Sequence, residues 1–167
     1  AAGHCPPNGF EDAIVRPISK MDASWFFNRQ WEIHAVGRFN LLTSFIPVLH
    51  SGARIVFVSS AITRLTQGGE LPPPFLHAAD YAAAIAAGDE IVRYARIDPT
   101  VLANKIQLDL VKLGAVDTPF HQGSNHRPPV LLSLDEAAKA IISVFERGEA
   151  GKDHWVLPEQ SKPATPR

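Results

Sequence analysis

The segment from Ala53 to Ser60 constrains the fold more than any other part of this sequence. It is a short and nearly continuous run of apolar residues, rich in β-branched side chains. Such a run is typical of a β-strand covered on both faces, which occurs chiefly in parallel sheets flanked by helices. We therefore expect an α/β domain built on a parallel sheet.

A long amphipathic helix is expected before this strand. Asp22 or Ser24 could cap its first turn, and Pro47 should bend or end its last turn before the chain leaves the helix at Gly52. Apolar residues recur along it at intervals of three and four, and we expect them to form its buried face. They are Phe27, Trp31, Ala35, Phe39, Leu42, Ile46 and Leu49.

A second helix is expected from about residue 78 to residue 95. Its alanines place small side chains along one side, where another helix could approach closely. They are Ala79, Ala82, Ala83, Ala86 and Ala87. A second subunit could supply the neighbouring helix.

The remaining segments complete an α/β pattern. Residues 105–111 alternate as a strand, residues 133–136 form a capping box that opens a helix, and residues 154–157 form a last strand. Residues 61–77 contain adjacent glycines and three consecutive prolines, so they favour an extended excursion that could act as a lid. Strands and helices that alternate in this way form parallel sheets, whose crossovers are right-handed almost without exception.

Composition limits the class of protein. The chain has 167 residues, 46% of them hydrophobic, which is enough to fill one core, and a formal net charge of −1 without a long basic run. Nucleic acid is therefore not an expected partner. Cys5 is the only cysteine, no two of the 7 histidines have the spacing of a helical zinc site, and no apolar run could cross a bilayer. We expect a soluble, cytoplasmic protein with no bound metal and no membrane partner.

Several short motifs follow one another in a characteristic order. They are Ala1-Ala2-Gly3, Trp31 with Gly37, the strand at residues 55–60, Tyr81, and the segment from Gly114 to Thr118. In this order they resemble the C-terminal two-thirds of a short-chain dehydrogenase/reductase. The resemblance implies an incomplete Rossmann-like parallel sheet with flanking helices over residues 1–158, followed by a flexible tail at residues 159–167. The abrupt start at Ala1-Ala2-Gly3, without an initiator methionine, suggests a processed product or a piece of a longer protein.

The resemblance assigns roles to particular residues. In that family a serine polarises the substrate carbonyl, a tyrosine transfers the proton, a lysine holds the nicotinamide ribose and lowers the tyrosine pKa, and an asparagine positions a water. Ser60 and Tyr81 match the first two, but the lysine position is Ile85 and the asparagine position is His34. Thr118 matches the threonine that holds the nicotinamide carboxamide, although leucine replaces the proline that usually precedes the glycine of that motif.

The replacement at position 85 governs what Tyr81 can do. A phenol titrates at about pH 10, and burial raises that pKa unless a cation or hydrogen-bond donors favour the phenolate. Ile85 lies one helical turn from Tyr81 and offers neither. Tyr81 should therefore stay protonated, able to donate a hydrogen bond and poor as a base. His34 could shuttle protons if the fold brings it within reach.

Each candidate also has a purely structural interpretation. Ser60 ends a strand, where a serine can simply bond a loop amide, and Thr118 precedes a proline as turn residues do. Tyr81 could be a core or interface aromatic, and His34 could pack and satisfy a backbone carbonyl. Only the combined order of the motifs favours a site.

The glycine-rich turn with which the family binds the dinucleotide pyrophosphate has no counterpart in this sequence. Gly68 and Gly69 lie in a long loop rather than between a strand and a helix. We therefore expect no cofactor to be bound by this chain alone, although the resemblance implies NAD(P). The strand at residues 54–59 would also lack its usual neighbour on one edge. We expect the N-terminal segment, a second copy of the chain or a separate polypeptide to cover that edge.

Three functions remain open. The first is a non-redox enzyme that isomerises, cyclises or dehydrates a small carbonyl compound, with Ser60 and Tyr81 as hydrogen-bond donors. The second is an NAD(P)-dependent oxidoreductase whose first half is missing or lies on another chain. The third is a catalytically inactive scaffold. Loss of the lysine and of the phosphate-binding turn favours the first, and a homo-oligomer formed through the two longest helices is expected besides.

Overall fold

Three parallel strands form a sheet in the computed structural model, which describes residues 25–67, 79–119, 130–147 and 151–158. Their order is β1-β2-β3. The strands are β1 (Arg54–Ser60), β2 (Gln107–Leu113) and β3 (Asp153–Val156). The predicted α/β class and the Rossmann-like parallel sheet with flanking helices are confirmed.

The register brings the ends of β1 and β2 level with each other. Arg54 pairs with Gln107 at the start, and Ser60 pairs with Leu113 at the end. Because carboxyl ends of parallel strands meet at one edge of the sheet, residues that follow β1 and β2 lie close together. Ser60 stands at this edge.

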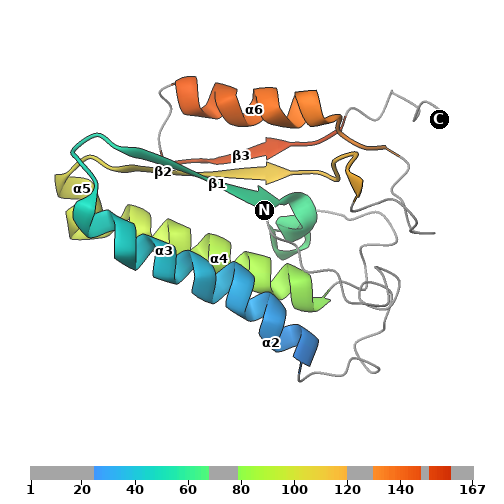
Figure 1. The fold of residues 1–167 in the computed structure, drawn as a ribbon, viewed down its shortest axis with the longest axis horizontal. Coiled ribbons are helices and arrows are strands. Elements are labelled where there is room, and N and C mark those ends of the chain that lie inside the picture. Colours follow the sequence, from blue (N-terminus) through green and yellow to red (C-terminus); the bar gives the residue numbers. More distant parts are fainter. Residues whose placement is uncertain (1–24, 68–78, 120–129, 148–150, 159–167) are drawn as a thin grey trace.

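Helices cover both faces of the sheet (Figure 1). One face carries α2 (Trp25–Trp31), the π-helical turn η2 (Glu32–Val36), α3 (Gly37–Phe45) and α4 (Ala79–Arg96). The other face carries α6 (Leu134–Glu146), which begins with the predicted capping box at Ser133. The short segments between these elements are η3 (Ile46–Val48), η4 (Ala61–Gln67) and α5 (Pro99–Ala103).

The two crossover connections do not have the same hand. The chain moves in one direction across the sheet from β1 to β2 and from β2 to β3. The helix between the first pair, α4, and the helix between the second pair, α6, lie on opposite faces (Figure 1). One of the two crossovers therefore departs from the right-handed rule that the sequence was expected to follow.

The core lies between the sheet and the layer that contains α3 and α4. Its centre is the middle strand β2, where Leu108 and Leu110 are completely enclosed. The side chains that pack around them come from α3, β1, α4, α5 and the residue directly before β2. They are Leu42, Phe57, Val92, Val101 and Ile106.

The long helix was predicted as one continuous element with a simple apolar face, and this is wrong because the π-helical turn η2 interrupts it. The bend predicted at Pro47 is confirmed, since α3 ends at Phe45 and the 3-10 turn η3 contains Pro47. A π turn inserts an extra residue, so it rotates the helix surface that faces the core. Trp31 and Phe39 are exposed as a result. The buried positions are Gln30, His34, Ala35, Arg38 and Leu42.

Helix α4 forms nearly where it was expected, but its predicted alanine face is not its buried face. Four alanines of that set are half-buried and Ala83 is exposed, so none of the five is fully enclosed. The buried residues are Asp80, Ala84, Ile85, Gly88, Asp89 and Val92, and they face α2, η2, α3 and the sheet. Although α4 is 18 residues long, no helix in the described ranges is both long and apolar enough to cross a membrane.

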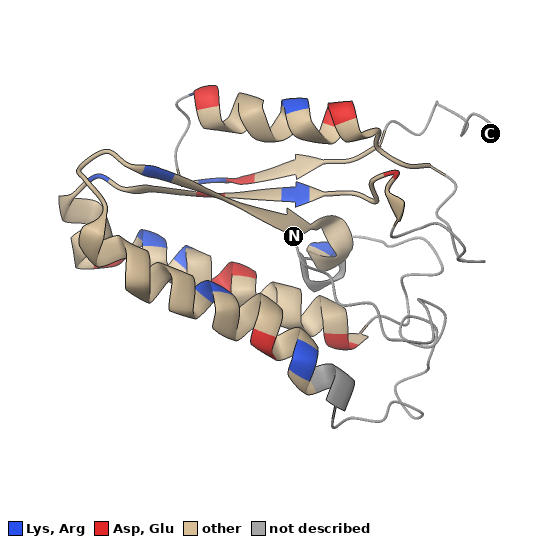
Figure 2. Ribbon diagram, in the orientation of Figure 1, with Lys and Arg blue, Asp and Glu red and all other residues tan. Residues whose placement is uncertain are grey.

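The strand predicted to alternate between buried and exposed residues is instead buried over its five central residues. β2 encloses every residue from Leu108 to Lys112, including the two charged side chains Asp109 and Lys112. Charged residues lie within the sheet as well as on the helices (Figure 2). Each buried charge has an ion-pair partner, which is how a central strand can contain them.

The extended loop that was expected after β1 begins instead with a 3-10 helix. Residues 61–67 form the 3-10 helix η4, in which Ala61, Ile62 and Thr63 are buried. The Thr63 hydroxyl donates to the carbonyl oxygen of Ser60 at 3.2 Å, which closes the first turn. The glycines and prolines of this segment, at residues 68–74, lie outside the described residues.

Candidate active site

Ser60 is fixed at the end of β1, where the strand turns into η4. Its hydroxyl accepts a hydrogen bond from the Ile62 amide at 3.3 Å, and its carbonyl accepts one from Thr63. The side chain is half-buried. A rigid strand end therefore holds this hydroxyl at the carboxyl edge of the sheet, the edge at which ligands bind in open α/β sheets.

Tyr81 lies in the first turn of α4 and meets both of the other candidate residues. Its hydroxyl is hydrogen-bonded to the side chain of Ser60. Its ring packs edge-on against the ring of His34, with centroids 5.2 Å apart and an interplanar angle of 81°. The structure thus brings together Ser60, Tyr81 and His34 from β1, α4 and η2.

His34 sits within the π-helical turn η2 and is buried. Burial, and secondarily the nearby Arg38 guanidinium, lowers the pKa of His34 to about 4. The ring is therefore neutral at pH 7. Its Nε2 atom is buried and has no hydrogen-bond partner in the described structure. A neutral imidazole with a free nitrogen can exchange a proton with a bound molecule, and π turns are frequent at functional sites.

The Tyr81 phenol is kept protonated by its surroundings. Burial raises the pKa of Tyr81, and the hydrogen bond with Ser60 and the charge of Arg38 oppose this only in part, while Asp89 adds to it. Ile85, one turn further along α4, is buried and apolar. The pKa of Tyr81 is therefore raised, as predicted from the absence of a lysine at position 85.

Gly88 lets the two helices come close enough for His34 to touch Tyr81. A Cβ atom at this position would overlap the carbonyl oxygen of His34 and would lie 3.0 Å from Cδ of Arg38. Any larger residue would push η2 away from α4. Gly88 was not predicted as part of the site, because a glycine within a helix gives no indication of which helix crosses it.

Thr118 does not join this group. It lies half-buried in a bend after β2, in a segment that the bridge between Val116 and Leu132 holds beside α6. Within the described ranges no hydrogen bond connects it to Ser60, Tyr81 or His34. Residues 68–77, which form most of the segment that could act as a lid, lie outside those ranges.

Asp80 is a further buried polar residue that sequence reasoning missed. Its carboxylate is enclosed at the start of α4, and Oδ1 has no hydrogen-bond partner in the part of the chain that is described. Burial raises the pKa of Asp80, although hydrogen bonds with the backbone amides of residues 80 and 81 oppose this. Its position next to Tyr81 was the one feature of the sequence that could have indicated a place in the site.

The arrangement of a parallel sheet with a serine at one strand end and a tyrosine on the following helix is that of the short-chain dehydrogenase/reductase fold. Solved structures of that fold superpose on most of the chain. No protein-family model matches the sequence, and no curated protein does either.

Three of these structures illustrate the likeness. A short-chain dehydrogenase from Burkholderia cenocepacia in complex with NADP has a TM-score of 0.66 and 22% identity, over 87% of this chain and 54% of that one. A blue fluorescent protein from a metagenomic library, in complex with NADPH, has a TM-score of 0.70 and 17% identity, over 88% and 60%. An alcohol dehydrogenase from the archaeon Thermococcus sibiricus, complexed with 5-hydroxy-NADP, has a TM-score of 0.67 and 18% identity, over 92% and 62%.

At these identities the likeness establishes the fold alone. The chain spans between 54% and 62% of the length of these three structures. Activity, substrate and cofactor therefore have to be argued from the residues of this chain.

Proposed function

We propose that this chain carries the active site of an enzyme that moves a proton on a small carbonyl compound without changing its oxidation state. One observation carries the proposal: a protonated phenol, a serine hydroxyl and a neutral imidazole with an unpartnered nitrogen meet at Tyr81, Ser60 and His34. Isomerisation, cyclisation and dehydration of carbonyl compounds all require such proton transfers.

Each residue has a defined task in this reaction. Ser60 and Tyr81 donate hydrogen bonds to the substrate carbonyl oxygen and stabilise the negative charge that develops there. Nε2 of His34 accepts the proton from the carbon next to the carbonyl, which leaves an enolate. The imidazolium then returns the proton to another carbon, or delivers it to a leaving hydroxyl group. Since Tyr81 stays protonated throughout, it acts as a donor and not as the base.

The described residues of this chain do not fit a complete nicotinamide dinucleotide. The position that would hold the ribose is Ile85, whose buried hydrocarbon side chain offers no hydrogen bond. The described residues contain no glycine-rich turn between a strand and a helix that could hold the pyrophosphate. Among the described residues, Thr118 matches a position with which the family holds the nicotinamide carboxamide. No step of the proposed reaction passes through the cofactor.

A second candidate is an NAD(P)-dependent oxidoreductase whose dinucleotide site is supplied by a polypeptide segment other than residues 1–167. Two observations favour it. The superposed structures named above are complexes of NADP, NADPH or 5-hydroxy-NADP, and they extend well beyond the region that this chain matches. In the described part of the sheet, β1 pairs with β2 and with no strand on its other side.

Exchange of α-protons tests the proposed reaction without knowledge of the natural substrate. A panel of small ketones and aldehydes is incubated with the protein in D2O, and loss of the α-proton signal is followed by NMR. We expect exchange that Tyr81→Phe and Ser60→Ala each slow by at least about tenfold, because each removes a donor to the developing oxyanion. Tyr94→Phe is the matched control, since Tyr94 is exposed on the same helix.

Two further results separate the candidates. His34→Asn should abolish exchange, and an unchanged rate in this variant would contradict the role of the imidazole. Equilibrium titration with NADH and NADPH distinguishes the second candidate. Micromolar affinity of residues 1–167 for either nucleotide would favour an oxidoreductase and count against the lead proposal.

A further inference from the structure

Three charged side chains form a buried network behind the candidate site. Arg38 donates to Oδ1 of Asp89 at 2.5 Å, and Lys112 donates to Oδ2 of the same carboxylate at 2.6 Å. The side chains of Asp89 and Lys112 are 0% exposed, and that of Arg38 is 10% exposed. Two cations share one anion here, so the trio carries one excess positive charge.

Each member of this trio also holds a residue that flanks Ser60. Arg38 donates to the carbonyl oxygen of Val58 at 3.1 Å, and Asp89 accepts from the Ser59 hydroxyl at 2.6 Å. Lys112 donates to the Thr63 hydroxyl at 3.0 Å. Thr63 in turn donates to the carbonyl oxygen of Ser60. The network therefore clamps both sides of the strand end that presents the serine.

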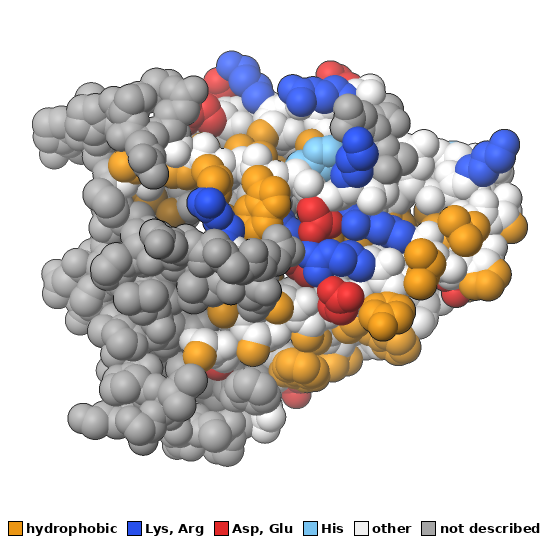
Figure 3. Space-filling model, turned by 180° about the vertical axis from the view of Figure 1, so that it is seen from behind, with side chains coloured by type: hydrophobic (Ala, Val, Ile, Leu, Met, Phe, Trp, Pro, Cys, Tyr) orange, Lys and Arg blue, Asp and Glu red, His pale blue; other side chains and the backbone are white. Residues whose placement is uncertain are grey.

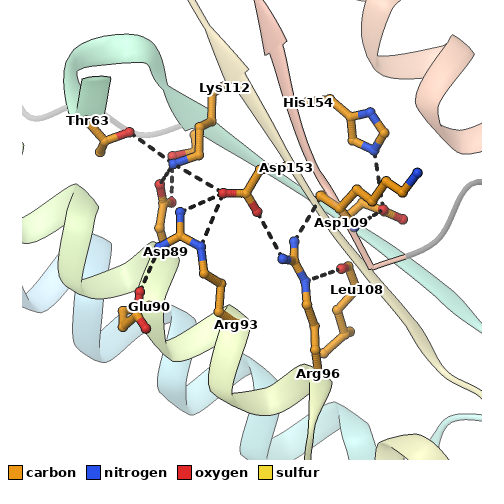
Figure 4. Close-up of polar contacts among 12 residues, drawn as sticks. Thr63, Asp89, Glu90, Arg93, Arg96, Leu108, Asp109, Lys112, Asp153 and His154 are labelled. Carbon is orange, nitrogen blue, oxygen red and sulfur yellow. Dashed lines mark hydrogen bonds and ion pairs between the residues drawn. The ribbon is translucent and has the colours of Figure 1, made fainter. Parts of the chain in front are cut away.

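A second layer of ion pairs closes the network toward the surface (Figure 4). Asp153 of β3 lies 3.5 Å from Nζ of Lys112 and pairs with Arg93 at 2.6 Å and Arg96 at 3.0 Å. The Trp155 ring covers the Lys112 ammonium, 4.9 Å from its centroid. Seen from behind, acidic and basic side chains adjoin one another in the middle of this face (Figure 3). Glu90 also pairs with Arg93, at 2.7 Å. The outer layer therefore holds two arginines and two carboxylates, which balance, and it does not cancel the positive excess of the trio.

We propose that Arg38, Asp89 and Lys112 are the positioning residues of the Ser60–Tyr81 site. They fix the strand end that presents Ser60, and they place one excess positive charge, carried by α3 and β2, behind the oxygen that becomes negative in the reaction. This inference rests on the proposed function, because it assigns the network to the same site. It also specifies the chemistry: the site is built for a substrate whose oxygen becomes negatively charged during the reaction.

The physical reason is the placement of the excess charge. A positive charge enclosed in protein acts over a longer range than one in water, because solvent does not screen it. The ionisable groups nearest Tyr81 are His34 on η2, Arg38 on α3, and Asp80 and Asp89 on α4. Arg38 lowers and Asp89 raises the pKa of Tyr81, so the two charges reach the phenol. An oxyanion bound at its hydroxyl would be subject to the same charges.

A titration of Tyr81 tests the inference directly. The chain has 2 tyrosines, Tyr81 and the exposed Tyr94, so a Tyr94→Phe background leaves a single phenol. Incorporation of 3-fluorotyrosine, whose phenol is more acidic than that of tyrosine, makes its ionisation visible by 19F NMR. Arg38→Met should move the midpoint upward and Asp89→Asn should move it downward, each by about half a pH unit or more.

Matched controls remove the same charges from the opposite layer. Lys139 and Asp135 form an exposed ion pair on α6, across the sheet from Tyr81. Lys139→Met and Asp135→Asn should leave the midpoint in place. Arg38→Lys should keep it near the parent value, because it retains the charge. If Arg38→Met does not fold, Arg38→Lys and Asp89→Asn decide the question alone.

The inference is overturned if Asp89→Asn leaves the midpoint unchanged, or if the α6 controls shift it as much as the network variants do. The titration needs no substrate, so it distinguishes this failure from failure of the proposed function. Absence of α-proton exchange with a responsive midpoint would reject the reaction and retain the charge network. Exchange of α-protons together with a midpoint that the network variants do not move would retain the reaction and reject the charge network.

Discussion

At the scale of single residues, the site depends on an imidazole that the fold holds in its neutral form. His34 is buried against the Tyr81 ring and beside the Arg38 guanidinium, and both burial and that charge disfavour its protonated form. A protonated His34 would place a second cation next to an arginine in the interior. The arrangement that suits a proton acceptor therefore makes the folded state sensitive to acid.

The stability of the protein should fall with acid in a way that His34 controls. Its pKa is about 4 in the folded state and 6.5 in the reference state. Between these values the unfolded chain binds more protons, so the free energy of unfolding rises with pH and is lost as pH falls from about 6.5 to about 4. Between pH 6.5 and pH 4 the free energy of unfolding of His34→Asn should fall less than that of the parent, by a difference on the order of 1 to 3 kcal/mol. Urea unfolding at several pH values measures it, with the exposed His50→Asn as control, and equal slopes in the two variants would contradict the prediction.

Loss of Lys112 should be costly although one cation remains beside Asp89. Lys112→Met would leave a fully buried carboxylate with Arg38 and Ser59 and would remove the ammonium that stacks on Trp155. Breaking a buried ion pair typically costs about 3 to 5 kcal/mol. The exposed Lys139→Met should cost no more than about 1 kcal/mol. Chemical denaturation of both variants measures the difference, and a Lys112→Met protein as stable as the parent would show that the pair contributes nothing.

Part of the candidate site was predicted from the sequence, and the rest was missed for a physical reason. Ser60, Tyr81 and His34 follow from motif order, and the protonated state of Tyr81 follows from the hydrocarbon at position 85. The network behind them does not, because Arg38 and Lys112 lie 51 and 23 residues from Asp89 in the chain. No periodicity connects such partners. The one signal was a lysine within an apolar strand, which implies a buried partner without identifying it.

At the scale of elements, one glycine and one π turn set the geometry of the site. η2 rotates the first helix so that polar side chains face α4, and Gly88 allows the two backbones to approach. The amphipathic pattern predicted a regular helix with Trp31 and Phe39 buried. It failed because a period of 3.6 residues presupposes that every turn is α-helical.

Gly88→Ala tests this close approach, because helix propensity and packing predict changes in stability of opposite sign. In an open helix this change stabilises by about 1 kcal/mol. Here the added methyl group would overlap the His34 carbonyl oxygen, and backbone atoms would have to move. We expect a loss of roughly 1 to 3 kcal/mol, the usual cost of overpacking. Thermal unfolding measures it, together with the Tyr81 19F shift, which should change as His34 moves away. A stabilised variant would show that α4 and η2 are not in close contact.

At the scale of the whole molecule, the sheet and its helices were predictable, but the cover of its outer edge was not. The apolar run at residues 55–58 and the capping box at Ser133 each led to the element that the structure contains. In the described part of the fold β1 has a neighbour on one side only, so what lies against its other side remains a prediction. Hydrophobic patterning specifies which faces are buried, but not which chain buries them.

The exposed apolar side chains of the first helix lead to a prediction about assembly. Phe39 and Phe45 of α3 are 53% and 50% exposed, in a helix whose other side packs on α4. Exposed aromatic groups of this kind favour association, so we expect the chain to form a homo-oligomer through this helical layer. Phe39→Asp combined with Phe45→Asp should shift sedimentation velocity profiles to the monomer, because association would then bury two carboxylates. Phe145→Asp on α6, where Phe145 is 56% exposed, should leave the profile unchanged. Dissociation by the α6 variant alone would place the interface on the opposite face of the sheet.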